Sequence, residues 1–170
     1  REKAAYYYKL AADQGHTVAQ SNYGFMLLKG KGVEQNKEEA LRYFEMAADD
    51  GYTKVLDPIV ELFDEGIFTS FSEQYKYYKL AADNGNQSAM LSVIILLEDP
   101  ESYELERDKK TLIKYARMLA ETGHKGGMYS YAYHTLYDCT LYKDSEDNEY
   151  FPDTEECKEA VSFCKRSADM

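Results

Sequence analysis

One eight-residue pattern recurs along this chain and constrains its fold more than any other feature. Residues 8–15 are YKLAADQG, residues 44–51 are FEMAADDG, and residues 78–85 are YKLAADNG. Weaker copies cover residues 116–123 and 164–169. The second alanines stand at positions 12, 48, 82, 120 and 168, so their spacings are 36, 34, 38 and 48 residues. A period of roughly 20 to 50 residues is typical of solenoids, in which each repeat is one supersecondary unit.

Each copy has the composition of a helix that ends at its last residue. The aromatic residue, the Leu or Met two positions later and the alanine pair form one apolar stripe at helical spacing. The small alanines allow a neighbouring helix to approach closely. Four copies close on a glycine, which is the residue best able to adopt the left-handed conformation after a helix: Gly15, Gly51, Gly85 and Gly123. We therefore interpret each copy as the second helix of a hairpin.

The segments between the copies supply the first helices. Val18, Ala19, Tyr23, Met26 and Leu27 follow one another at helical spacing after the first copy, and similar patterns follow the others. We predict that four first helices and five second helices alternate along the chain. The second helices restart at Asn36, which we place as an N-cap with Glu39 three residues later, near Ser72 and near Asp108. Pro58 predicts the start or a kink of one first helix, because proline lacks the backbone donor.

A longer pattern runs from Ala19 to Gly51: Ala-x3-Tyr-Gly-x5-Gly-x-Gly-Val-x6-Ala-x2-Tyr-Phe-x2-Ala-Ala-x2-Gly. This pattern resembles a Sel1-like repeat, a relative of the tetratricopeptide repeat. The resemblance extends through the second helices over nearly the whole chain. It departs in the first helices of later units, where Gly24 is replaced by Val60, Ile94 and Ala132. It implies an all-α fold, a right-handed α/α superhelical solenoid of helix-turn-helix repeats.

We expect a single solenoid fragment over residues 1–170, divided by the closing glycines. The expected parts are the second helix of a truncated repeat at 1–15, repeats at 16–51, 52–85 and 86–123, and a degenerate repeat at 124–170 that carries a long acidic loop at 143–156. Since no glycine occurs in that loop, it does not match a calcium-binding loop, and we expect it to be solvated.

The charge balance excludes one class of partner. There are 31 acidic and 20 basic residues, which gives a net charge of −11. A phosphate backbone would be repelled by this field, so we expect no nucleic acid. The longest apolar run, Met90 to Leu97, is less than half of the roughly 20 residues that a membrane span needs, so we expect no membrane insertion. A basic or amphipathic protein segment fits an acidic chain better.

The reactive residue types do not form a recognisable site. The three cysteines, at positions 139, 157 and 164, have no CxxC spacing, so we expect no metal and no cofactor. We interpret them as unpaired thiols, which favours the cytoplasm, with the endoplasmic reticulum lumen as the alternative. His16 and His124 directly follow closing glycines, so a role at helix starts accounts for both. His134 and Cys139 are five residues apart, on different helix faces. We therefore expect no catalytic residues and no enzyme activity.

The resemblance implies what such a chain does. Sel1-like proteins are known as scaffolds and adaptors, in ubiquitin-ligase complexes, in bacterial host interactions and beside kinase domains. By analogy with tetratricopeptide repeats, a partner peptide or helix would lie on a concave surface formed by the first helices. The implied partner-binding residues are Phe25, Leu28, Lys29, Glu61, Asp64, Glu65, Leu91, Ile95, Glu98, Tyr129, Tyr133 and Tyr137. In the alternative interpretation, these tyrosines pack against a further repeat and the carboxylates face only water.

Two other functions remain open from the sequence. The chain could be an architectural segment that docks into a larger assembly through its convex face or its repeat ends. It could also be the regulatory region of a larger enzyme, such as a protein kinase or a ubiquitin-ligase complex. End-to-end stacking is favoured by Ala4, Tyr7 and Leu10, which lack a preceding hairpin to cover them.

Overall fold

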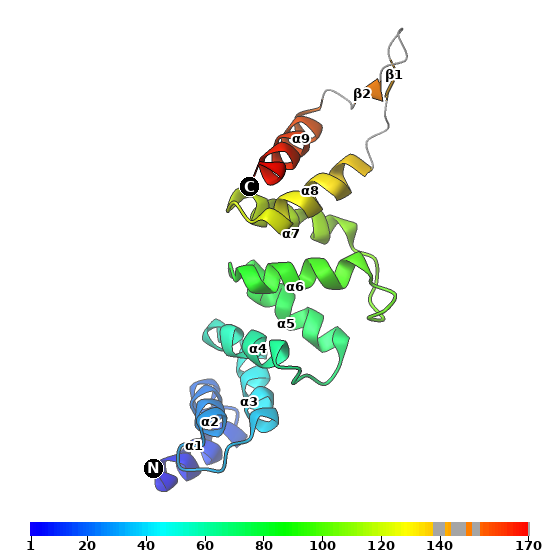
Figure 1. The fold of residues 1–170 in the computed structure, drawn as a ribbon. Helices are drawn as coiled ribbons and strands as arrows, with labels where there is room; N and C mark the ends of the chain where they lie inside the picture. The colour runs from blue at the N-terminus through cyan, green and yellow to red at the C-terminus, as the bar shows by residue number, and fades with distance from the viewer. Residues whose placement is uncertain (138–141, 144–148, 151–153, 170) are drawn as a thin grey trace. The chain divides into compact units, whose positions relative to one another are not determined.

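The chain was analysed as a computed structural model that describes residues 1–137, 142–143, 149–150 and 154–169. Within these residues the chain is an all-α repeat solenoid, as predicted, in which first and second helices of hairpins alternate (Figure 1). The second helices are α1 (Glu2–Asp13), α3 (Lys37–Asp49), α5 (Phe71–Asp83), α7 (Lys109–Glu121) and α9 (Glu155–Ala168). The first helices are α2 (Thr17–Lys29), α4 (Leu56–Asp64), α6 (Gln87–Glu98) and α8 (Lys125–Tyr137).

Short elements complete the described part of the chain. A 3-10 turn, η1 (Thr53–Val55), leads into α4, whose third residue is Pro58. Proline is tolerated there because the first turn of a helix has no internal acceptor for its N–H, so Pro58 marks a helix start as predicted. The strands β1 (Tyr142–Lys143) and β2 (Glu149–Tyr150) pair antiparallel, with Tyr142 opposite Tyr150.

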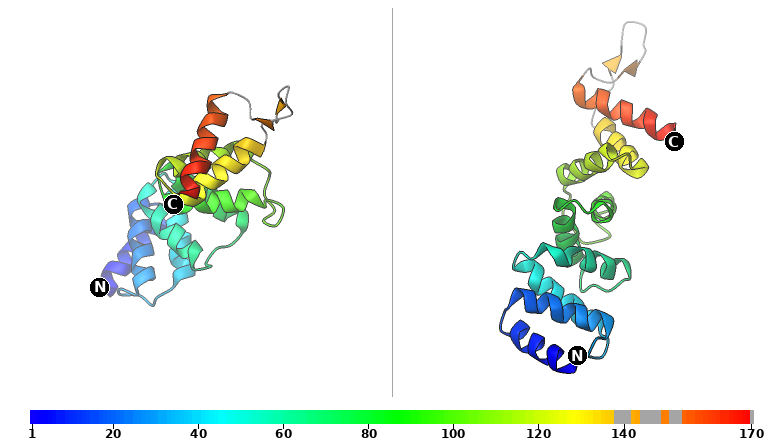
Figure 2. Two further views of the ribbon diagram at one scale, coloured as in Figure 1. Left: turned by 45° about the horizontal axis from the view of Figure 1, so that its top comes forward. Right: turned by 90° about the vertical axis from the view of Figure 1, so that its left-hand side faces the viewer.

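The chain divides into two compact units, Arg1–Ala89 and Met90–Met170, with the boundary inside α6. In the first unit each helix from α1 to α5 packs against the next one along the chain, and the right-hand view of Figure 2 shows α1, α2 and α3 in succession. In the second unit α8 packs against both α7 and α9. Fully buried side chains such as Phe44, Ile59, Tyr115 and Leu119 form the cores of these units.

The glycines that close the second helices have the backbone conformation that the sequence predicted. At Gly15, φ is +86°, its N–H donates to the carbonyl of Ala12, and the N–H of His16 donates to the carbonyl of Ala11. This pair of bonds is the Schellman motif, and the same pair recurs after α3, α5 and α7. The helix ends are therefore fixed by local hydrogen bonds.

The residue after the glycine also begins the next helix. Nδ1 of His16 accepts a hydrogen bond from the N–H of Ala19 at 3.3 Å, and Nδ1 of His124 accepts one from the N–H of Gly127 at 3.2 Å. The predicted helix-start role of both histidines is thus confirmed. Asn86 has the same role at the start of α6, where its side-chain oxygen accepts from the N–H of Ala89 at 2.8 Å.

Two predicted helix starts differ from the structure. Helix α5 begins at Phe71 and is capped by Ser70, whose hydroxyl accepts from the N–H of Glu73 at 3.2 Å, so the prediction of a start near Ser72 was slightly late. Helix α9 begins at Glu155, inside the predicted acidic loop 143–156, because Thr154 caps it by accepting from the N–H of Cys157. Residues 144–148 and 151–153 of that loop lie outside the described residues. The predicted cap at Asn36 and the predicted restart near Asp108 are confirmed, and Asp108 itself caps α7.

The cysteines differ from their interpretation as unpaired thiols. Cys157 is disulfide-bonded, whereas Cys164 is free and exposed. Cys139 lies outside the described residues, so the predicted separation of Cys139 from His134 on different helix faces stays a prediction. The disulfide at Cys157 removes the argument that unpaired thiols favour the cytoplasm.

Candidate functional site

Three exposed tyrosines follow one another along α8 and form what we call the tyrosine ladder. Tyr129, Tyr133 and Tyr137 are 63%, 50% and 76% exposed. They lie four residues apart, so they occupy the same face of the helix on successive turns. The rings of Tyr129 and Tyr133 stack with centroids 6.1 Å apart, and those of Tyr133 and Tyr137 are 5.9 Å apart. The ladder is therefore a preformed aromatic surface.

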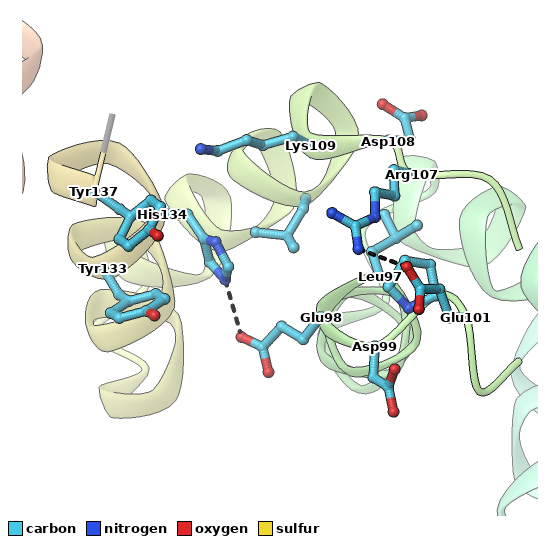
Figure 3. Close-up of a pocket in the computed structure, with 12 residues that line it drawn as sticks. Leu97, Glu98, Asp99, Glu101, Arg107, Asp108, Lys109, Tyr133, His134 and Tyr137 are labelled. Carbon is cyan, nitrogen blue, oxygen red and sulfur yellow. Dashed lines mark hydrogen bonds and ion pairs between the residues drawn. The ribbon is translucent and has the colours of Figure 1, made fainter. Parts of the chain in front are cut away.

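Two of these tyrosines, Tyr133 and Tyr137, border a pocket of about 370 Å³ in the second unit (Figure 3). Its walls are the end of α6, the segment between α6 and α7, the start of α7 and the C-terminal half of α8. The lining residues are Leu97, Glu98, Asp99, Pro100, Glu101, Arg107, Asp108, Lys109, Leu112, Tyr133, His134 and Tyr137. Sequence analysis had selected three of these as partner-binding residues, and the structure brings them together across two helices.

Glu98 is the carboxylate that faces the ladder helix. Its Oε1 accepts a hydrogen bond of 3.0 Å from the hydroxyl of Ser130, and Nε2 of His134 lies 3.4 Å from the same oxygen. The side chain of Glu98 remains 43% exposed. His134 is held in turn against the edge of the Tyr133 ring, with centroids 5.0 Å apart and an interplanar angle of 88°. Glu98 is therefore oriented from α8 while part of its carboxylate is open to the pocket.

The remaining charges of the pocket are partly paired. Arg107 and Glu101 form an exposed ion pair at 2.7 Å, drawn as a dashed line in Figure 3. Asp108 accepts from the N–H of Thr111 and so caps α7. The ammonium of Lys109 lies 5.8 Å from the centroid of the Tyr137 ring, within the range of a cation–π interaction. Four carboxylates and two cationic side chains line the pocket, so its balance is acidic.

The polar cluster lacks the geometry of a nucleophilic site. Such a site needs a hydroxyl that donates to a histidine, which a carboxylate then orients. In the described part of the chain, Ser130 and His134 instead both contact Oε1 of Glu98, and no hydrogen bond joins Ser130 to His134. The described part of the chain also has no group of three or more His, Cys, Asp or Glu side chains placed to hold a metal ion. In this cluster Ser130 and His134 orient the carboxylate of Glu98, which can attract a cation.

The other predicted residues of the second unit lie on α6. Ile95 is half-exposed and Leu91 is half-buried. Both precede Glu98 on the same helix, one and two turns away. They add apolar surface to the helix that carries the carboxylate.

The predicted residues of the first unit are more engaged within the fold. Phe25 is half-buried and packs edge-to-face on Phe44, with centroids 4.9 Å apart, and the ammonium of Lys29 lies 5.7 Å from the Phe25 ring. Leu28 is also half-buried. These residues contribute to the packing of α2, which the sequence analysis did not separate from binding.

Of the three acidic binding residues predicted on and after α4, two already have partners within the fold. Asp64 accepts a hydrogen bond from the hydroxyl of Tyr78 at 3.0 Å, and Glu65, which follows the helix, pairs with Lys37 at 2.7 Å. Glu61 is exposed, and its side chain forms no hydrogen bond or ion pair with the described residues. Of the three, Glu61 remains the most accessible candidate for a partner.

Sequence reasoning missed Ser130 and His134, which position Glu98. Ser130 belongs to the buried side of α8, and His134 is half-buried beside the ladder. No repeat signal marks either residue, because the later first helices depart from the pattern of the first. A contact between α6 and α8 depends on how the helices pack.

A second accessible surface lies on α1 in the first unit. Tyr6, Tyr7, Tyr8 and Leu10 are exposed large apolar residues. An apolar pocket of about 390 Å³ lies there, between α1 and the start of α2. Its lining residues are Ala4, Tyr7, Tyr8, Ala11, His16, Val18, Ala19 and Asn22.

Comparison with known proteins agrees with the helical repeat fold. The Sel1 repeat model matches residues 1–16, 17–52 and 75–86. No curated protein shows significant sequence similarity to the chain. A crystal structure of a Sel1 repeat protein from Oxalobacter formigenes is similar, with a TM-score of 0.58 and 26% identity over 99% of this chain and 64% of that one.

A second solved structure shows the same fold. It is a protective antigen present in uropathogenic Escherichia coli strains, with a TM-score of 0.56 and 23% identity over 97% of this chain and 33% of that one. The chain thus spans less than two thirds of the length of either structure.

Proposed function

Because this chain is a Sel1-like repeat protein, we propose that it is a non-catalytic scaffold that binds a segment of a partner protein on the tyrosine ladder beside Glu98. Sel1 repeats in general form protein-interaction scaffolds, so the finer proposal concerns the surface and its occupant. Among the described helices, none has the length and apolar composition that spanning a bilayer requires.

The exposure of the ladder carries this proposal. Three tyrosines on consecutive turns present a contiguous aromatic surface, and such surfaces on folded proteins mark interaction sites. Tyrosine is enriched where partners bind, since its rigid ring gives a large contact area at a low cost in side-chain entropy. The rings are already stacked on one another, so little further ordering accompanies binding.

An architectural role has its own supporting observation, at α1. Tyr7 and Tyr8 occupy the positions of Tyr43 and Phe44 in the repeat, one period of 36 residues later. Tyr43 and Phe44 are 7% and 0% exposed, whereas Tyr7 and Tyr8 are 67% and 39% exposed. A helix that covered α1 as α2 covers α3 would bury them. This surface supports docking of the repeat end in a larger assembly as the second candidate function.

The compartment is also a proposal. Disulfides persist in oxidising compartments and are rare in the cytoplasm. The disulfide at Cys157 therefore supports a location such as the endoplasmic reticulum lumen over the cytoplasm.

Single substitutions in each surface distinguish the functions. Proximity labelling of partners in cells would compare the wild type with Tyr133→Ala, Glu61→Lys and Tyr7→Ala, after circular dichroism and thermal unfolding have shown that each variant is folded. The proposal expects loss of a defined set of partners in Tyr133→Ala and their retention in Tyr7→Ala. Loss in Tyr7→Ala alone would favour the architectural role instead. Loss in Glu61→Lys as well would extend the binding surface to the first unit.

A further inference from the structure

We infer that the ladder and Glu98 together form a receptor for a guanidinium group, so that the bound segment of the partner presents an arginine. This inference rests on the proposed function and names the chemistry of its occupant. It is carried by three features of the second unit, which are an oriented carboxylate, an aromatic surface beside it and a cation that already contacts that surface.

The carboxylate is oriented and only partly used. Ser130 and His134 both contact Oε1 of Glu98, and no described residue donates a hydrogen bond to its Oε2. An arginine can donate an N–H group to the open Oε2, and charge-assisted bonds of this kind are about twice as strong as neutral ones. The exposed Asp99 lines the same pocket and adds negative charge beside Glu98. The pocket therefore has the charge that complements a cation.

The aromatic surface fits the remainder of an arginine side chain. Tyr133 and Tyr137 line the pocket from α8, the helix whose His134 contacts Glu98 (Figure 3). Arginine buries its methylene stem along apolar surface while its charged head reaches polar groups. Its planar guanidinium also stacks on aromatic rings, which a compact, strongly hydrated ammonium does less well. The combination of ring and carboxylate favours arginine over lysine.

The fold itself shows that the ladder accepts a cation. The ammonium of Lys109 lies 5.8 Å from the centroid of the Tyr137 ring. Elsewhere in the pocket, Arg107 pairs with Glu101 at 2.7 Å. Lys109 and Arg107 are thus directed to Tyr137 and Glu101, whereas the polar contacts of Glu98 come from Ser130 and His134 of α8. An incoming guanidinium would thus find Glu98 without a cationic partner from lysine or arginine in the described chain.

The test uses small probes that differ from arginine either in charge or in the shape of the cationic group. The 15N-labelled protein would be titrated with N-acetyl-arginine amide, N-acetyl-citrulline amide and N-acetyl-lysine amide at equal ionic strength, and amide chemical shifts would be followed by NMR. Citrulline has nearly the shape of arginine without the charge. We expect saturable shifts at residues 98, 130, 133 and 134 with the arginine probe, weaker shifts with lysine and none with citrulline.

Variants locate the site. Glu98→Gln keeps an oxygen that can accept from Ser130 but removes the charge, and Tyr133→Ala removes the central ring. Each should weaken the apparent Kd of the arginine probe about fivefold, which corresponds to a contact of about 1 kcal/mol. Glu155→Gln removes the same charge from an exposed position of the same unit, and Tyr6→Ala removes an exposed tyrosine of the other unit. Both controls should leave the Kd unchanged.

The outcomes separate this inference from the proposed function. Equal shifts with citrulline, an absence of saturable shifts with arginine, or an unchanged Kd in Glu98→Gln would each overturn the guanidinium receptor. If Tyr133→Ala still abolished partner labelling in cells, the scaffold function would stand with an occupant of different chemistry. If arginine bound as expected but labelling survived Tyr133→Ala, the receptor would stand and the proposed function of the ladder would fail.

Discussion

The hydroxyl of Tyr43 donates a 2.7 Å hydrogen bond to Oδ1 of Asp13, thirty residues earlier in the chain. The same relationship recurs one repeat later, where the hydroxyl of Tyr77 donates to Asp49 at 3.1 Å. In each case the tyrosine lies on one second helix and the aspartate follows the alanine pair of the preceding one. A lysine also contacts each carboxylate. This bond therefore links consecutive repeats through a position that every clear copy of the pattern contains.

Removing one hydroxyl should measure the strength of this link. Tyr43 is buried, and a hydrogen bond to a charged group contributes about 1.5 to 3 kcal/mol. Because Asp13 is half-exposed, which weakens the bond, we expect Tyr43→Phe to lower the free energy of unfolding by about 1 kcal/mol, below that range. Urea unfolding followed by circular dichroism measures this. Tyr6→Phe, at an exposed tyrosine, is the control, and equal effects of the two substitutions would contradict the prediction.

The loss of stability at acidic pH should also depend on the hydrogen bond between Tyr43 and Asp13. The hydrogen bond from Tyr43, and after it the one from Lys9, lower the pKa of Asp13 below its ordinary 3.8. A carboxyl with a lowered folded-state pKa stabilises the protein above its unfolded pKa, and this contribution disappears as the pH falls through the folded pKa. Asp13→Asn should therefore be less stable than the wild type at pH 6, and the difference should shrink below pH 3.8. Thermal unfolding from about pH 6 down to about pH 2.5 checks this, since that range crosses the ordinary pKa of 3.8. A difference that does not change with pH would refute it.

Glu45 should change the stability of the protein with pH in the direction opposite to Asp13, because its pKa is raised. Burial, with the nearby carboxylates of Glu73 and Asp49, raises the pKa of Glu45 from 4.5 to about 7. Its Oε1 is buried without a hydrogen-bond partner among the described residues. A raised folded-state pKa gives a contribution that is fully present below the unfolded pKa and is lost as the pH rises through the folded one.

The matching variant is Glu45→Gln, which is neutral at every pH. The wild type should lose stability relative to Glu45→Gln as the pH rises from the ordinary pKa of 4.5 to the folded pKa of about 7, and the difference should level off above it. Thermal unfolding of both proteins across that range measures the change. Parallel curves for the two proteins would show that Glu45 does not titrate there.

A close approach at Gly24 should make α2 sensitive to a single methyl group. A Cβ at this position would lie 2.7 Å from Cε1 and 2.8 Å from Cδ1 of Phe44, whose ring is fully buried. Overpacking of this kind costs about 1 to 3 kcal/mol, so Gly24→Ala should lower the free energy of unfolding by that amount. In the double variant with Phe44→Leu, part of this loss should disappear because the smaller side chain relieves the contact. Additive effects of the two substitutions would contradict the steric explanation.

Ser70 shows how local sequence signals could have been used better. Ser70 and Glu73 have the spacing of a capping box, and Ser70 accepts from the N–H of Glu73 at 3.2 Å. The prediction placed the start near Ser72. Phe71 packs against Phe68, with centroids 5.2 Å apart, and this contact accompanies the earlier start. The signal was present in the sequence, but two nearby serines made it ambiguous.

The predicted binding residues fall into two groups, those that are accessible and those that already pack against other side chains. Glu61, Glu98 and the ladder are accessible, while Phe25 and Asp64 contact Phe44 and Tyr78 within the first unit. Helical spacing places a residue on a face of its own helix. It does not say whether a side chain from another helix already occupies that face.

By itself, the sequence determined the repeat period, the helix order and the helix ends. These depend on interactions within a few residues, such as the left-handed Gly15 and the cap at His16, so the local order of residues is sufficient. Only the tertiary structure decided that Glu98 meets Ser130, 32 residues away, and that the ladder borders the same pocket. Such contacts depend on how side chains from separate helices fit together in a close-packed interior, which repeat spacing alone does not specify.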